Sequence, residues 1–197
     1  SVGFRPKKYI NDFFLKPALQ DYYRINQIIL GSKKLHLYFN LEEIIRNKLN
    51  FKKKIEFNDH HTNHLASTYF PSGYSKSLVV SFDGMGENET GYFGKANDGK
   101  LTVIHKKNCF PNSLGLIYSS VTSYLGWKHN CDEGIIMGLA SYGKPNSKIK
   151  KTNKTYIKIF RDIIKYKNGL DYEINKEYIT YHKERDTWVS PKFIKIF

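Results

Sequence analysis

The most constraining feature of this chain is a short apolar run that ends at an acidic, glycine-rich turn. Residues 77–82 read Ser-Leu-Val-Val-Ser-Phe, a pattern typical of a strand that is buried on both faces. Asp83-Gly84-Met85-Gly86-Glu87 follows at once, where this strand would leave its sheet. Binding sites of open α/β folds lie beyond the ends of such strands. The run therefore predicts a layered α/β domain with a functional site near Asp83.

The rest of the chain predicts helices mixed with short strands. We interpret residues 1–50 as a helical N-terminal segment of the same domain as residues 51–197. Apolar residues recur there at helical spacing, namely Ile25, Ile28 and Ile29, and Leu41, Ile44, Ile45 and Leu49. The other expected helices cover residues 60–70, 113–127, 133–140 and 156–166. The expected strands are residues 52–57, 90–95 and 101–107, with a hairpin turn at Asn97-Asp98-Gly99, and residues 168–197 are expected to alternate strands and loops.

Charge and cysteine content limit the class of protein. The formal net charge is +14, but only 5 of the 32 basic residues are Arg, whose planar fork is preferred for phosphates and base edges. We therefore expect no specific nucleic-acid partner. No apolar run approaches the roughly 20 residues that cross a bilayer, so no membrane role is expected. Cys109 and Cys131 suggest reduced thiols and a cytoplasmic protein.

His60 and His64 are candidate metal ligands. They stand at positions i and i+4 of a predicted helix, so both rings project from one face and can reach one ion. His61 lies about 100° further round the helix and is expected to miss that ion. A histidine-rich helix cap without metal is the alternative.

Asp83 completes this candidate site. Two imidazoles and one carboxylate form a triad that suits Fe(II), Mn(II) or Zn(II) with coordination positions left open. Gly84 and Gly86 allow the backbone to approach a ligand and to present N–H groups to anionic oxygens. Glu87 adds a second carboxylate. A turn with solvated acidic side chains is the alternative.

Four stretches, residues 59–72, 81–87, 110–119 and 137–145, occur in the same order as in a known family. They read DHHTNHLASTYFPS, SFDGMGE, FPNSLGLIYS and MGLASYGKP. Together they resemble the carbamoyltransferase family related to NodU and TobZ. The chain departs from that family at Ile135 and Ile136, where a Lys is expected, and at Ser141, where Pro is usual.

The resemblance implies part of an actin-like ATPase (ASKHA, Kae1-like) domain, an α/β fold with a mixed sheet flanked by helices. It also implies that a C-terminal lobe and a YrdC-like domain lie outside residues 51–197. Family members make carbamoyl-adenylate from carbamoyl phosphate and ATP, and they transfer the carbamoyl group to a hydroxyl of a sugar or natural-product acceptor. We therefore expect the chain to be a fragment, inactive alone, of such an enzyme.

The resemblance also assigns roles to residues. His60 and Asp83 match metal ligands, His64 matches the second histidine of the HxxxH motif, and Fe²⁺ is the expected ion. The co-substrate, ATP or carbamoyl-adenylate, is expected near Gly84, Gly86, Asn112 and Tyr142. Because the acceptor hydroxyl must lose a proton, Glu87 or His61 is expected to act as the general base. Two alternatives remain open, an inactive structural relative and a Lys-rich nucleic-acid-binding protein.

Overall fold

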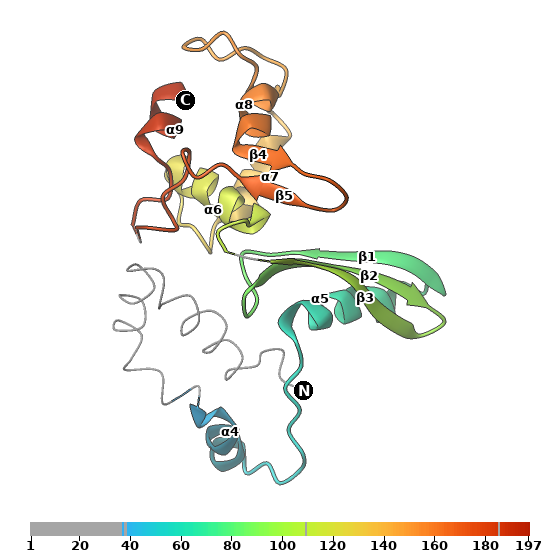
Figure 1. The fold of residues 1–197 in the computed structure, drawn as a ribbon. Coiled ribbons are helices and arrows are strands. Elements are labelled where there is room, and N and C mark those ends of the chain that lie inside the picture. The colour runs from blue at the N-terminus through green and yellow to red at the C-terminus, as the bar shows by residue number, and fades with distance from the viewer. Residues whose placement is uncertain (1–36, 38, 109, 185) are drawn as a thin grey trace. The chain divides into compact units, whose positions relative to one another are not determined.

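The structure is a computed structural model that describes residues 37, 39–108, 110–184 and 186–197 (Figure 1). These residues form two compact units. One contains the described residues up to Ser81 together with Met85–Asn108, and the other contains Phe82–Gly84 together with the described residues from Phe110 onward. The helical pattern predicted around Ile25 lies outside the described residues. Within the described part, no helix combines the length and the hydropathy needed to cross a bilayer.

In its described residues, the first unit contains two α-helices and a three-stranded sheet, all except Phe82, the last residue of the first strand. Its elements are α4 (Leu41–Leu49), α5 (His60–Tyr69), the 3₁₀ turn η2 (Phe70–Ser72), β1 (Lys76–Phe82), β2 (Glu89–Asn97) and β3 (Lys100–Asn108), and the strand order is β1-β2-β3. The helical spacing through Leu41–Leu49 is thus confirmed. The strand predicted at residues 52–57 is wrong, because only Phe57 takes part in a β-bridge. The three lysines of that stretch are exposed and offer no apolar face to bury.

The hairpin predicted from Asn97-Asp98-Gly99 is present. Strands β2 and β3 pair antiparallel from Glu89↔Asn108 to Asn97↔Lys100. Asp98 and Gly99 have φ angles of 46° and 79°, so both central residues of the two-residue turn adopt positive φ. Such turns match the right-handed twist of paired strands, which explains the preference for Asp-Gly here.

Helix α5 packs on one face of this sheet (Figure 1). Their shared core consists of Leu65, Tyr69, Val79, Tyr92 and Ala96. On the other face, Leu78 and Val80 of β1 are 67% and 41% exposed. The prediction that β1 is buried on both faces is therefore wrong for the described structure, because a helical layer covers one face of this strand and not the other.

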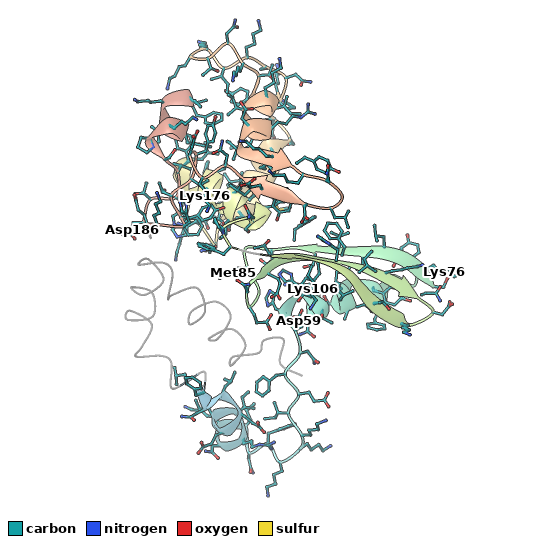
Figure 2. The ribbon with its side chains drawn as sticks, viewed as in Figure 1. Asp59, Lys76, Met85, Lys106, Lys176 and Asp186 are labelled. Carbon is teal, nitrogen blue, oxygen red and sulfur yellow. The ribbon has the colours of Figure 1, made fainter. Side chains whose placement is uncertain are left out.

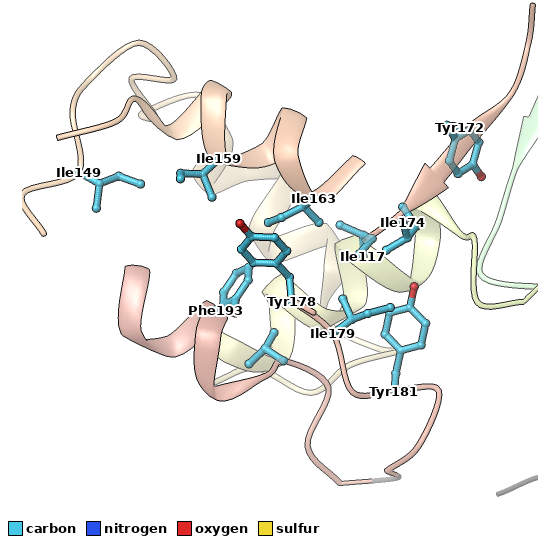
Figure 3. Close-up of a cluster of buried hydrophobic side chains, with 11 residues drawn as sticks. Ile117, Ile149, Ile159, Ile163, Tyr172, Ile174, Tyr178, Ile179, Tyr181 and Phe193 are labelled. Atoms are coloured by element: carbon cyan, nitrogen blue, oxygen red, sulfur yellow. The ribbon is translucent and has the colours of Figure 1, made fainter. Parts of the chain in front are cut away.

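In its described residues, the second unit contains four α-helices and a two-stranded sheet. It contains α6 (Leu114–Tyr124), α7 (Glu133–Ala140), α8 (Tyr156–Ile163), β4 (Ile164–Tyr166), β5 (Tyr172–Ile174) and α9 (Pro191–Ile196). Its core is a cluster of aliphatic and aromatic side chains from α6, α8, β5, α9 and the segments between them (Figure 3). Ser113 caps α6, because its hydroxyl accepts a hydrogen bond from the backbone N–H of Leu116 at 3.0 Å.

Two predicted helix ends and one predicted element type in this unit are wrong. Helix α6 ends at Tyr124 rather than Trp127, and α8 ends at Ile163 rather than Tyr166. Residues 164–166 instead form β4, which pairs antiparallel with β5. Helix α9 lies where strands and loops were expected. The hydroxyl of Ser190 caps α9, and Pro191 occupies its first turn, so a local signal for this helix was present in the sequence.

Candidate metal centre

The first turn of α5 is anchored to β2 through Asp59. Asp59 Oδ1 accepts hydrogen bonds from the backbone N–H and the hydroxyl of Thr62, at 3.0 and 3.1 Å. Asp59 Oδ2 accepts a hydrogen bond from the Tyr92 hydroxyl at 2.9 Å. Burial, reinforced by the bond to Asp59, raises the pKa of Tyr92 far above its usual value. Figure 2 shows Asp59 at the start of the helix that carries both candidate histidine ligands.

The structure brings the three predicted metal ligands together. The Nε2 atoms of His60 and His64 lie 3.0 Å apart, with ring centroids separated by 4.6 Å. His60, His64 and Asp83 each offer one ligand atom, and these atoms all lie within 4.8 Å of one another. Asp83 immediately follows the end of β1, so the helix face and the strand end supply the donors as the sequence suggested.

The backbone around Asp83 is held by the beginning of α6. The Ser113 hydroxyl lies 3.0 Å from the carbonyl oxygen of Asp83 and 2.7 Å from that of Gly84. A Cβ atom added to Gly115 would lie 2.5 Å from the Asp83 carbonyl carbon, so only glycine allows this approach. The Gly84 N–H donates to Asp83 Oδ1 at 2.6 Å. Sequence reasoning did not assign Gly115 a role, because its value depends on a neighbour 32 positions away, beyond any local pattern.

His61 and Glu87, the predicted general bases, are both completely buried. His61 has its ring nitrogens 2.9 Å from Ser81 Oγ and 2.9 Å from the carbonyl oxygen of Glu89. Glu87 belongs to a second cluster of ligand atoms, with Asp59 and Glu89. Neither side chain is exposed to an acceptor, so the general-base role stays a prediction without geometric support.

The residues predicted to bind the co-substrate have different local surroundings. The Gly86 N–H donates to the carbonyl oxygen of Glu89 at 2.8 Å. Asn112 Oδ1 accepts a hydrogen bond from the backbone of Ile174 at 2.9 Å, which joins it to β5. Tyr142 is 83% exposed and lines an apolar pocket of about 810 Å³ with Lys144 and other residues after α7. Their ligand-binding roles stay predictions.

A second, open pocket of about 580 Å³ has Asp83 in its wall. Its other lining residues include Asn130 and Glu133, neither of which the sequence singled out. Glu133 Oε1 accepts hydrogen bonds from the Ser119 hydroxyl at 2.5 Å and from the Asn130 N–H at 2.6 Å. Burial alone would raise the pKa of Glu133, but these hydrogen bonds outweigh it and lower the pKa below its usual value. The surroundings of Glu133 therefore favour its ionised form in this pocket.

The donor set fits a divalent transition metal. Two imidazole nitrogens and one carboxylate oxygen are ligands that suit Fe(II), Mn(II) and Zn(II). Ligand atoms within 4.8 Å of one another can reach one ion with small side-chain movements, since such bonds are about 2 Å long.

The chain matches a protein-family model and is similar to several known proteins. The family model described as Carbamoyltransferase N-terminus matches residues 11–197. An uncharacterized protein of Synechocystis is 35% identical over 142 residues, which cover 72% of this chain and 21% of that protein. An uncharacterized protein of Methanocaldococcus jannaschii is 32% identical over 176 residues, which cover 88% of this chain and 32% of that protein.

The nodulation protein NolNO of Sinorhizobium fredii is 37% identical over 94 residues, which cover 47% of this chain. The chain spans 13% of NolNO and no more than 32% of the two uncharacterized relatives. The described helices and sheets therefore correspond to a minor part of each of these proteins.

Proposed function

This chain belongs to the carbamoyltransferase family, and from that premise we propose that it builds part of the acceptor site of an O-carbamoyltransferase. The family's N-terminal part is the Kae1-like domain, which confirms the predicted actin-like α/β fold class. The observation that carries the proposal is the convergence of His60, His64 and Asp83 in a chain of this family.

The proposed reaction moves a carbamoyl group from carbamoyl-adenylate to a hydroxyl of a sugar or natural-product acceptor. Carbamoyl-adenylate would be made from carbamoyl phosphate and ATP in a YrdC-like domain of the full-length protein. The acceptor oxygen forms a new bond to the carbamoyl carbon, and the bond from that carbon to the phosphate oxygen breaks. AMP leaves with the electron pair, and the hydroxyl proton passes to a base.

His60, His64 and Asp83 would hold a divalent ion, for which Fe²⁺ is proposed. Such an ion, when bound, supplies a Lewis acid that offsets negative charge on phosphate and carbonyl oxygens. Other residues of the chain position these three ligands. Asp59 fixes the first turn of α5, and Ser113 and Gly115 fix the backbone that carries Asp83. The ligands are thereby held in place before any substrate arrives.

The pocket beside Asp83 is the proposed place for the acceptor. Its ionised Glu133 is oriented by Ser119 and by the Asn130 N–H, and a carboxylate so fixed can accept a hydrogen bond from an acceptor hydroxyl. Because the pocket is open, it can admit a group carried on a larger molecule. We assign Glu133 to holding the acceptor and not to removing its proton, since a lowered pKa makes it a weak base.

The test separates the two half-reactions in the full-length protein. His60→Ala should abolish transfer to the acceptor while leaving carbamoyl-adenylate formation close to the parent rate. His105→Ala, a histidine change on β3, is the matched control and should keep both activities. Transfer that survives in His60→Ala, or loss of both half-reactions together, would reject the assigned role.

The chain alone is expected to be inactive. It spans only 21% of the Synechocystis relative, so most of a two-lobed enzyme and its adenylating domain would be missing. The purified chain should be supplied with Fe(II), ready-made carbamoyl-adenylate and a panel of hydroxylated acceptors. AMP release coupled to a carbamoylated product, faster than hydrolysis, would show that these residues suffice for transfer.

A further inference from the structure

We propose that His61 is a positioning residue that joins the two halves of the candidate metal centre. One half is the pair His60 and His64 on α5, and the other is Asp83 after β1. The inference rests on the proposed function, because it assumes that these three residues hold a metal ion. It gives His61 a task that differs from the general-base role expected from the sequence.

The hydrogen bonds of His61 determine which nitrogen carries the proton in the neutral ring. The Glu89 carbonyl oxygen can only accept a hydrogen bond, so His61 Nε2 must donate across the 2.9 Å that separate them. In the neutral ring, Nδ1 is then the acceptor and receives a hydrogen bond from the Ser81 hydroxyl at 2.9 Å. Because His61 is completely buried, neither bond competes with bulk water.

These partners bracket Asp83 along the chain. Ser81 precedes Asp83 by two residues in β1, and Glu89 begins β2 on the far side of the connection. The same Glu89 carbonyl also accepts the Gly86 N–H at 2.8 Å, so both of its lone pairs are used. One imidazole therefore fixes both ends of the connection that carries Asp83.

His61 also fixes the helix side of the centre. It lies between His60 and His64 in the sequence of α5, and its ring centroid is 5.3 Å from that of His60. A Cβ atom added to Gly86 would lie 3.0 Å from His61 Cδ2 and 3.2 Å from His60 Cβ. The connection is thus packed tightly against the turn that bears the ligands, and a shift of His61 must move His60, the connection, or both.

A histidine that merely fills the core would give a different result from one that positions ligands. Removing a core contact lowers the stability of the fold but leaves the metal affinity of the remaining folded molecules unchanged. Removing a positioning contact lowers that affinity even where the protein is fully folded. Mutation of residues that support metal ligands without binding the metal typically lowers metal affinity about 10- to 100-fold.

The experiment measures Co(II) and Fe(II) affinity of the full-length protein by competition with a chelator, well below the melting temperature of the metal-free form. Ser81→Ala removes one partner of His61, and His61→Gln retains a donor for Glu89 but loses the ring. Both should weaken binding about tenfold or more and alter the Co(II) absorption spectrum. Ser81→Thr keeps the hydroxyl and should restore parental affinity.

Ser72→Ala is the control, because its hydroxyl also bonds to a backbone carbonyl, that of Tyr69, at the other end of α5. It should leave affinity and spectrum unchanged. If His61→Gln does not fold, the comparison of Ser81→Ala with Ser81→Thr tests the positioning role by itself. Parental affinity and spectrum in Ser81→Ala would overturn the positioning role.

His60→Ala and His64→Ala are included to separate this inference from its premise. If both lose metal while the Ser81 and His61 variants bind normally, the metal centre stands and the positioning role fails. If both retain parental affinity, the metal centre itself is rejected and the positioning role falls with it.

Discussion

Gly115 lies so close to Asp83 that a Cβ atom on the glycine would stand 2.5 Å from the carbonyl carbon of the aspartate. The same atom would lie 2.5 Å from the backbone nitrogen of Gly84. Real Cβ atoms do not approach backbone atoms at that distance, so the residue type at position 115 controls where the proposed metal ligand Asp83 sits.

Gly115→Ala is therefore expected to displace the Asp83 backbone. The clash should lower the free energy of unfolding by about 1–3 kcal/mol and weaken metal binding by the full-length protein. Gly134→Ala in α7 is the matched control, because a Cβ there meets nothing within 4 Å and alanine favours a helix. Chemical denaturation and chelator competition measure the two effects. Equal stability and affinity in both variants would contradict the inferred constraint.

The bond between Asp59 and Tyr92 is expected to couple α5 to β2 energetically. Asp59→Ala removes a helix cap worth about 1 kcal/mol and also leaves the Tyr92 hydroxyl without this acceptor. The double variant with Tyr92→Phe should therefore be more stable than the sum of the single changes predicts, by about 1 kcal/mol. Tyr74→Phe, at a tyrosine that is 70% exposed, is the control. Strict additivity in a double-mutant cycle would show that the bond contributes nothing.

The sequence predicted those parts of the fold whose signals are local. Asp98 and Gly99 adopt the positive φ angles that their residue types favour, and Asp59 and Ser113, residue types common at helix caps, cap α5 and α6. The boundary at Ile163 was not predictable in this way. The apolar pattern up to residue 166 fits a helix and a strand equally well. Residues 164–166 form a strand because they pair with β5, and no local rule reveals that pairing.

In the candidate site, too, local patterns were predictable and contacts between distant residues were not. The i, i+4 spacing of His60 and His64 and the acid after β1 were sufficient to anticipate three ligand atoms within 4.8 Å. The environment of His61 was not predictable, because its partners Ser81 and Glu89 lie 20 and 28 positions away. The sequence does not reveal burial that arises from such distant contacts. A general-base role, which requires access to substrate, was therefore expected for a histidine that has no exposure.

Glu133 provides a prediction about pH. Its pKa in the folded protein is lowered from 4.5, because hydrogen bonds from Ser119 and the backbone outweigh the effect of burial. A lowered pKa contributes stability that is present above the unfolded value and is lost as the pH falls through the folded value. Glu133→Gln should therefore melt below the parent at pH 7, with the difference vanishing in acid. Glu43→Gln on exposed α4 is the control. A melting difference that is constant down to pH 3 would contradict the assignment.

The excess of lysine gives the last prediction, weak and non-specific binding to nucleic acid. The net charge is +14, so some attraction to phosphate is expected at low salt. Several described lysines are nevertheless paired with acids, including Lys54 with Glu56 and Lys167 with Glu173, both at 2.8 Å. Fluorescence anisotropy with unrelated DNA and RNA sequences should give similar affinities.

Those affinities should fall steeply between about 50 and 200 mM salt, because binding that depends on counterion release has this dependence. Replacing Lys148, Lys150 and Lys151 by Gln should weaken the low-salt binding, since these residues form a run that can contact phosphates together. The same number of Lys→Gln changes at the dispersed positions 76, 100 and 176 is the control for net charge. An equal loss from both sets would mean that total charge, not the run, drives association. Tight binding to one sequence at physiological salt would instead require a recognition surface and would contradict the expectation of no specific nucleic-acid partner.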